Sequence, residues 1–242
     1  MARAARRGSA GPALFFAGLA LLAVLAFVSA WPDMEASVFD AGTSLAADEA
    51  LRSMDCPVMI AADETSSVAA SFANRSDRPE SFLVRSRVTR GFITLVKEDT
   101  QQVHLEPGEE RTLSWPIEAD NAAYRRLVMA RVLATRSAVH NAREGSCGVL
   151  VIGVTGISGQ ALFAVLLLAA LALVAAGATD WWWRRRPLLP TEQDTVRRVG
   201  ALAALVAASL VLGLLGWWLP SHLALVTAAL YAVLLGEQTV TR

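Results

Sequence analysis

The stretch Gln160–Ala178, QALFAVLLLAALALVAAGA, runs for nineteen positions without a charged residue. About 20 apolar residues of helix cross a hydrocarbon core about 30 Å thick. Similar apolar runs occupy Ala13–Trp31 and Val199–Leu219, and a shorter one occupies His222–Gly236. The sequence therefore predicts four transmembrane helices, with a tight turn at Leu219–Ser221 joining the last two.

Arginine clusters flank these runs at 3–7, 184–186 and 197–198, on one side of the membrane if the chain crosses four times. Basic residues next to spans stay on the cytoplasmic side. The segments on this side hold 9 arginines and 4 acidic residues, whereas residues 31–155 hold 13 basic and 18 acidic residues. Arginine supplies 21 of the 22 basic residues, which favours a GC-rich bacterial genome. We expect a bacterial inner membrane protein with both termini inside.

The first span has two interpretations. Its arginine-rich start, apolar run and Val28-Ser29-Ala30 fit a signal peptide that is cleaved after Ala30. The apolar run exceeds the usual signal-peptide length, which favours an uncleaved anchor. The predicted order of domains is an anchor at 1–31, an extracytoplasmic domain at 32–155, a second helix at 156–183, a cytoplasmic loop at 184–198, and a helical hairpin with a short tail at 199–242.

Hydrophobicity in the extracytoplasmic block alternates with a period of two, the pattern of β-strands. Turn residues separate the runs, for example Arg90-Gly91 and Pro107-Gly108. The predicted strands are Pro57–Asp63, Ser67–Asn74, Ser81–Thr89, Phe92–Glu98, Gln102–Leu105, Arg111–Ile117, Leu127–Thr135 and Cys147–Gly153. Such short, regularly spaced strands favour an antiparallel β-sandwich. The sequence at 44–54 fits either a short helix or an extended lead-in.

The cysteine pair supports an exported domain. Cys56 and Cys147 both fall in the block between the first two spans, one near each end. A cysteine pair outside the cytoplasm is typically a disulfide, and closing a loop of this length stabilises a fold by about 4–5 kcal/mol. The sequence therefore predicts a structural disulfide between them.

The segment Asp120-Asn121-Ala122-Ala123-Tyr124 resembles the tyrosine corner of immunoglobulin-like domains. The runs Ser71–Pro79 and Leu105–Glu110 are similar to those of bacterial Ig-like and fibronectin-like envelope domains. This resemblance to membrane-anchored envelope sandwiches is at the level of architecture. It implies that Asp120 and Tyr124 form the corner, and that the cysteine pair joins the first strand to the last.

The spans favour helix packing over transport. Ionisable residues in spans usually mark substrate or proton paths, and none lies within these runs apart from His222 at a boundary. Small residues that allow close helix approach recur in the last two spans. They are Gly200, Ala204, Ala208, Ala224, Ala228, Ala232 and Gly236. They predict either packing within the hairpin or docking onto another membrane subunit.

Two chemical alternatives remain open. Ser53 lies in a segment that faintly resembles the serine box of type I signal peptidases, with Lys97 as the lone candidate base. Soft ligands of the kind that exported copper proteins use are also present in the block. They are Met54, Cys56, Met59, His104 and His140. A disulfide at Cys56 would remove the thiolate from this set.

The acidic domain argues against nucleic-acid binding, and no small-molecule substrate is evident. The cytoplasmic arginines at 184–186 are expected to contact lipid headgroups. The sequence thus predicts an α+β membrane protein with four transmembrane helices and one exported Ig-like sandwich. We expect no enzyme activity or cofactor, and a role as an accessory or scaffold subunit that binds a membrane-protein partner.

Overall fold

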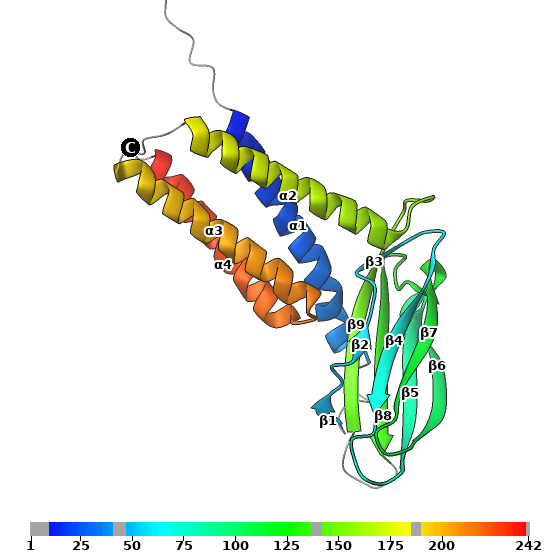
Figure 1. Cartoon of the computed structure of the whole chain (residues 1–242). Helices are drawn as coiled ribbons and strands as arrows, with labels where there is room; N and C mark the ends of the chain where they lie inside the picture. The colour runs from blue at the N-terminus through cyan, green and yellow to red at the C-terminus, as the bar shows by residue number, and fades with distance from the viewer. Residues whose placement is uncertain (1–9, 41–46, 137–141, 185–189, 241–242) are drawn as a thin grey trace, which may run out of the picture. The chain divides into compact units, whose positions relative to one another are not determined.

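The computed structural model describes residues 10–40, 47–136, 142–184 and 190–240 (Figure 1). It confirms a mixed α and β chain with four long apolar helices and sheets of mainly antiparallel strands. The chain divides into two compact units. The helical unit contains the residues up to Ala30 and from Ala164 onward, and the sheet unit contains Trp31–Phe163.

The helices are α1 (Ala10–Val38), α2 (Gly159–Arg184), α3 (Pro190–Leu214) and α4 (Trp218–Val240). Each is long and apolar enough to cross a membrane. Helix α1 continues past the predicted end of the first span, through Pro32. Helix α3 begins at Pro190, a favourable first position because the N–H that proline lacks would have no partner within the helix. The second half of the predicted 184–198 loop is therefore helical.

The turn between α3 and α4 lies earlier than Leu219–Ser221. Gly216 has a φ of 73°, which a glycine adopts without a steric penalty. Its N–H donates to the Gly213 carbonyl, and the Trp217 N–H donates to the Leu212 carbonyl, the two bonds of a Schellman motif. The predicted turn residues instead form the first turn of α4, where Pro220 is tolerated.

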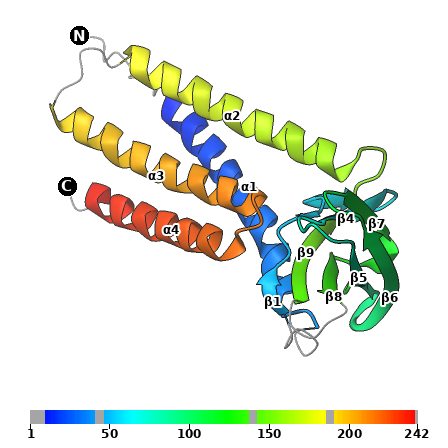
Figure 2. The same cartoon turned by 60° about the horizontal axis from the view of Figure 1, so that its bottom comes forward.

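Two kinds of contact hold the helical unit together. Helices α3 and α4 run side by side (Figures 1 and 2) and exchange hydrogen bonds between Ser209 and Ser221, both buried. Helices α1 and α2 approach closely at glycines. A Cβ on Gly18 would lie 2.7 Å from the Val174 nitrogen, and one on Gly177 would lie 2.4 Å from the Phe15 nitrogen. Because these glycines have no side chain, the backbones of α1 and α2 can pack in direct contact.

The strands are β1 (Ala47–Ala50), β2 (Met54–Asp55), β3 (Met59–Ala61), β4 (Thr65–Ala73), β5 (Glu80–Arg90), β6 (Phe92–Leu105), β7 (Glu110–Glu118), β8 (Leu127–Arg136) and β9 (Ala142–Ile152). One sheet has the order β1-β9-β8-β5-β6, with β3 also on β9, and the other has the order β2-β4-β7. The short strands β1 and β3 pair parallel to β9, unlike the fully antiparallel pattern that was expected. The lead-in at 44–54 is extended where it is described.

The two sheets pack face to face, as the end-on view in Figure 2 shows. Phe72 and Trp115 of the smaller sheet contact Phe82, Val84 and Val132 of the larger one. A second cluster continues this core and contains Cys147. Strands such as β5 and β7 bury alternate residues toward this core, which is why a period of two indicated them, whereas β8 is buried on both faces from Leu127 to Val132.

A disulfide joins Cys56, just after β2, to Cys147 on β9, with a Cα–Cα distance of 6.6 Å. It links chain segments 91 positions apart. Because β2 belongs to the smaller sheet and β9 to the larger one, the bond connects the two layers.

The last two turns of α1 cover the outer face of the larger sheet. Ala36 and Phe39 pack on Met129, and the Gly148 N–H donates to Asp33 Oδ1 at 3.0 Å. A Cβ on Gly148 would lie 2.0 Å from the Pro32 carbonyl oxygen, so only glycine fits there. This part of α1 is thus an integral piece of the sheet unit.

A buried arginine holds the end of α1. Arg131 on β8 is 4% exposed and pairs with Glu144 on β9. Its Nη2 donates to the Ser37 carbonyl oxygen at 3.0 Å, near the helix C-terminus, where a cation is favoured by the helix dipole. Beyond the helix, Asp40 pairs with Arg87 of β5. Charged side chains of two strands, Arg131 of β8 and Arg87 of β5, therefore hold this segment against the sheet.

Candidate functional site

A cavity of about 600 Å³ opens between the two sheets. Its apolar floor is formed by Leu51, Phe72, Phe82 and Ala134, all less than a tenth exposed. Its polar lining comes from segments far apart in the sequence. It consists of Glu49, Arg52, Ser53, Ser71, Arg75, Glu110, Arg136 and Arg143. The volume lies in the range of small-ligand pockets.

The polar lining of the cavity carries more positive than negative side chains. Four arginines face two glutamates in a domain whose overall charge is negative. Arg143 pairs with Glu49 at 2.8 Å, and Arg136 pairs with Glu80 at 2.8 Å while it lies 5.4 Å above the Phe82 ring.

Two further arginines of the lining, Arg52 and Arg75, have no ion-pair partner among the residues that the structure describes. Both are exposed. The cavity therefore carries unneutralised positive charge at its rim.

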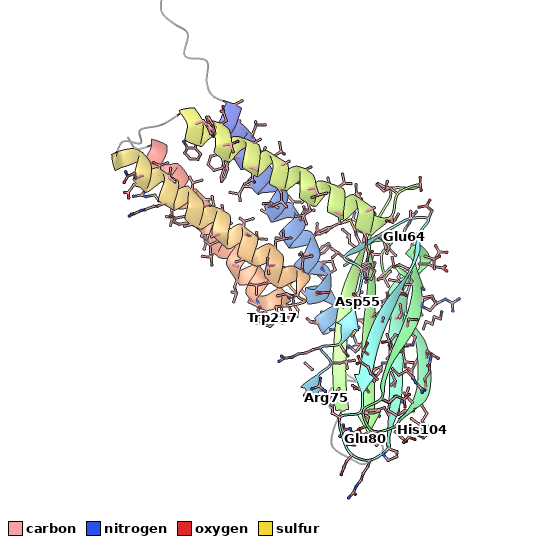
Figure 3. The ribbon with its side chains drawn as sticks, in the orientation of Figure 1. Asp55, Glu64, Arg75, Glu80, His104 and Trp217 are labelled. Atoms are coloured by element: carbon pink, nitrogen blue, oxygen red, sulfur yellow. A yellow bond between two sulfur atoms is a disulfide. The ribbon has the colours of Figure 1, made fainter. Side chains whose placement is uncertain are left out.

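A buried asparagine positions Arg75. Asn74, 1% exposed, donates to the carbonyl oxygens of Arg78 at 2.7 Å and Leu105 at 3.0 Å, and accepts from the Ser76 N–H at 3.0 Å. These bonds fix the turn after β4. Figure 3 places Arg75, Glu80 and His104 toward the same end of the two sheets.

The candidate copper ligands are not brought together. Cys56 is in the disulfide, Met59 is buried in β3, and the Met54 sulfur packs near Gly145. His104 Nδ1 is hydrogen-bonded to the Ser81 hydroxyl at 2.6 Å, and His140 lies outside the described residues. No three His, Cys, Asp or Glu side chains converge in the described part of the chain.

The candidate peptidase pair is separated as well. The Ser53 hydroxyl donates to the Ser71 carbonyl at 2.5 Å, beside the smaller sheet. Lys97 lies on β6 of the larger sheet, opposite Val88. Within the described part of the chain, the Ser53 hydroxyl has no hydrogen bond to a basic side chain of the kind that activates a serine nucleophile. Ser53 instead contributes to the lining of the arginine cavity.

The predicted tyrosine corner has a different geometry. Asp120 lies in the short 3₁₀ helix η2 (Ala119–Asn121), and Tyr124 has a φ of 53° with its side chain 66% exposed. The Tyr124 ring lies edge-on against Phe92, with centroids 6.4 Å apart. A tyrosine corner would bury the ring and bond its hydroxyl to the backbone. The left-handed backbone at Tyr124 and Arg125 turns the ring outward instead.

The small-residue stripe of α3 faces away from its neighbours. Gly200, Ala204 and Ala208 are exposed, and a Cβ on Gly200 would meet nothing within 4 Å. Helix α3 packs instead through other residues. These are Val199, Leu202, Val206, Ser209 and Leu210. The packing between α3 and α4 therefore does not involve Gly200, Ala204 or Ala208.

The α4 stripe is mixed. Ala228 is 2% exposed, Ala224 is half-buried and Ala232 is exposed, while the side-chain environment of Gly236 lies outside what the structure describes. Ala228 and Ala232 line an apolar groove of about 500 Å³. Helix α1 forms the other wall, with Leu202 and Val206 of α3 between them. The α1 wall consists of Phe16, Leu19, Ala20, Ala23, Val24 and Phe27.

Sequence reasoning missed the close helix crossing and the arginine cavity. Gly18 and Gly177 are sites of close approach between α1 and α2. The sequence does indicate these contact positions, because each is an isolated glycine within an alanine- and leucine-rich span. The cavity left no such signal, because its arginines come from the segments before β2, after β4, at the end of β8 and in β9.

No family model matches this chain, and no curated protein matches it. Similar solved structures include a β-glucuronidase of Bacteroides uniformis, with 12% identity and a TM-score of 0.28 over 39% of this chain and 12% of that chain. A β-glucosidase of Listeria innocua in complex with glucose has 15% identity and a TM-score of 0.27, over 43% and 16%.

A third is the CsuC–CsuE chaperone–tip adhesion subunit pre-assembly complex from archaic chaperone–usher Csu pili of Acinetobacter baumannii. It has 17% identity and a TM-score of 0.25, over 42% of this chain and 54% of that chain. This chain thus spans less than a fifth of either glycosidase. With TM-scores this low, none of these similarities carries an argument about fold or function.

Proposed function

We propose that this protein is a non-catalytic accessory subunit of a bacterial inner membrane complex, with its Ig-like sheet domain outside and both termini inside. The observation that carries the proposal is the alanine-rich apolar groove between α1 and α4. Lipid tails are as apolar as leucine side chains, so burial of apolar surface does not drive helices together in a membrane. Helices associate instead through close packing, which small residues allow. We infer that a helix of the partner occupies this groove.

The orientation rests on the arginine distribution of the sequence. The uncleaved anchor is supported by packing in the helical unit. Ser29 and Ala30 are 6% and 1% exposed, and a Cβ on Gly213 of α3 would lie 2.4 Å from Ser29 Oγ. Cleavage after Ala30 would require these buried residues to become accessible. An N-terminal epitope tag should therefore remain on the full-length protein, and its loss from the mature product would contradict the anchor.

The groove is tested by purification from native membranes in mild detergent, with mass spectrometry of what co-elutes. A variant with Ala20, Ala229 and Ala232 replaced by leucine fills the groove, because these exposed alanines line it. We expect a stoichiometric membrane partner to be lost from this variant, while the protein itself remains folded by circular dichroism.

The matched control replaces Ala201, Ala204 and Ala208 with leucine. These alanines are exposed on α3 and do not line the groove, so this variant adds the same apolar volume elsewhere. Retention of the partner by the control supports the groove. Loss from the control alone would place the partner on the α3 stripe and reject the groove, and a wild-type protein that elutes alone would reject the accessory role.

A further inference from the structure

We propose that the arginine-lined cavity of the sheet unit binds a small organic anion, one phosphate or carboxylate group carried on an apolar body. This inference is independent of the helix groove. It rests on the chemistry of the cavity lining, which combines an apolar floor with two guanidinium groups, those of Arg52 and Arg75, that have no carboxylate partner among the described residues.

The charge of the ligand follows from Arg52 and Arg75. A guanidinium group presents a planar fork of donors that matches the two oxygens of a carboxylate or phosphate. Two of the acidic groups near the cavity are paired, since Glu49 pairs with Arg143 and Glu80 pairs with Arg136. The third, Glu110, forms no ion pair among the described residues, so it offsets only one of the two positive charges of Arg52 and Arg75. Arg52 and Arg75 therefore keep their donors available to an incoming anion.

The apolar part of the ligand follows from the floor. Phe72 and Phe82 are 5% and 4% exposed and contact the core below, so they present a fixed apolar surface to the cavity. Arg136 lies over the Phe82 ring and is held there by Glu80, which fixes one wall. An aromatic or aliphatic body would cover this floor while its charged group meets the rim.

Hydrogen bonds hold the backbone segments that carry Arg52 and Arg75. The Asn74 turn fixes the backbone of Arg75, as described above. Arg52 lies between β1 and β2, where the Leu51 N–H donates to the Glu144 carbonyl and the Ser71 N–H donates to the Ser53 carbonyl. Backbone bonds to both sheets therefore hold the Arg52 segment across the cavity mouth. Such pre-organisation reduces the entropy cost of binding.

Calorimetric titration of the full chain in phosphatidylcholine nanodiscs tests the site. The probes are phenyl phosphate, benzoate, inorganic phosphate and the neutral benzamide. We expect saturable binding of phenyl phosphate or benzoate, weaker binding of inorganic phosphate because it lacks an apolar body, and no binding of benzamide. Absence of saturable binding by both organic anions overturns the proposal.

A double variant, Arg52→Gln with Arg75→Gln, should weaken binding by about tenfold or more, since charge-assisted hydrogen bonds are lost. The matched control, Arg90→Gln with Arg126→Gln, removes two exposed arginines that do not line the cavity and should bind as the wild type does. Both variants need an unchanged urea midpoint. Equal weakening by both variants, or by neither, overturns the site.

The natural anion has two possible sources, a soluble molecule or a lipid headgroup. Repeating the titration in nanodiscs that contain phosphatidylglycerol separates them. A lower apparent affinity for phenyl phosphate in the wild type supports the site with a headgroup as its occupant. An unchanged affinity supports the site with a soluble anion.

Discussion

Replacing Arg131 with methionine should destabilise the sheet unit more than any other single charge removal on the larger sheet. The side chains of Arg131 and Glu144 are only 5% and 12% exposed, so the change leaves a nearly buried carboxylate without its partner. It also removes the donor to the Ser37 carbonyl at the end of α1. Removing one partner of a buried ion pair typically costs about 3–5 kcal/mol.

The assay is urea unfolding of the full chain in detergent, read by pulse proteolysis of the sheet unit. With an m-value of about 2 kcal/mol per M, the expected loss lowers the midpoint by roughly 1.5–2.5 M. Arg126→Met is the matched control, because Arg126 is exposed just before β8 and has no ion-pair partner in the described residues. It should change stability by less than about 0.5 kcal/mol. Equal midpoints for the two variants would refute the argument.

The pH dependence of this loss gives a second readout. Burial raises the pKa of Glu144 above its ordinary value of 4.5, while Arg131 acts in the opposite direction. A carboxyl group with a higher pKa in the folded chain than in the unfolded chain stabilises the fold while it is protonated. This contribution of Glu144 is fully present below its ordinary pKa, and it is lost as the pH rises through its folded-state pKa. Without Arg131, that pKa rises further, so deprotonation at neutral pH costs more.

We therefore expect the difference between wild type and Arg131→Met to be larger at about pH 7.5 than at about pH 5. Adding Glu144→Gln to Arg131→Met should recover part of the lost stability at the higher pH, because the amide carries no charge. A loss that is the same at both pH values would mean that packing, and not the unpaired carboxylate, is responsible.

Replacing both Cys56 and Cys147 with alanine should lower the free energy of unfolding by about 4–5 kcal/mol in the chain-entropy model for a loop of this length, seen as a lower urea midpoint. An unchanged midpoint would show that the disulfide does not constrain the unfolded chain. Gly159→Ala should destabilise the start of α2, because its Cβ would lie 2.3 Å from the Met59 carbonyl oxygen. Gly153→Ala is its control, with open space around the new Cβ, and similar proteolysis rates for the two would reject the clash.

The strand positions were predictable because local chemistry set them. The run Ser81–Thr89 became β5 (Glu80–Arg90), where Gly91, with a φ of 77°, makes the turn that the Arg90-Gly91 pair had indicated. The same reasoning split β6 into Phe92–Glu98 and Gln102–Leu105. Its polar middle breaks the alternation, but β6 is an edge strand whose pairing with β5 continues through Thr100. Backbone pairing overrode the side-chain pattern there.

The candidate site was beyond sequence reasoning because register assembles it. Arg136 reaches the cavity because it pairs opposite Phe82, and Arg143 because it pairs opposite Glu49. A shift of one residue in either pairing would turn these side chains to the other face of the sheet. No local motif encodes that register, so the four arginines look in the sequence like scattered surface charges.

The end of α1 shows how tertiary contacts overrule a local stop signal. The predicted first span ends at Trp31, directly before Pro32 and Asp33, which are unfavourable inside a helix and inside a membrane span respectively. The helix continues to Val38 because the sheet supplies what this segment lacks. Gly148 leaves room for the Pro32 carbonyl and its N–H donates to Asp33, and Arg131 donates to the Ser37 carbonyl near the helix C-terminus. A segment that would be frayed in isolation is therefore stabilised as a helix by the domain that follows it in the sequence.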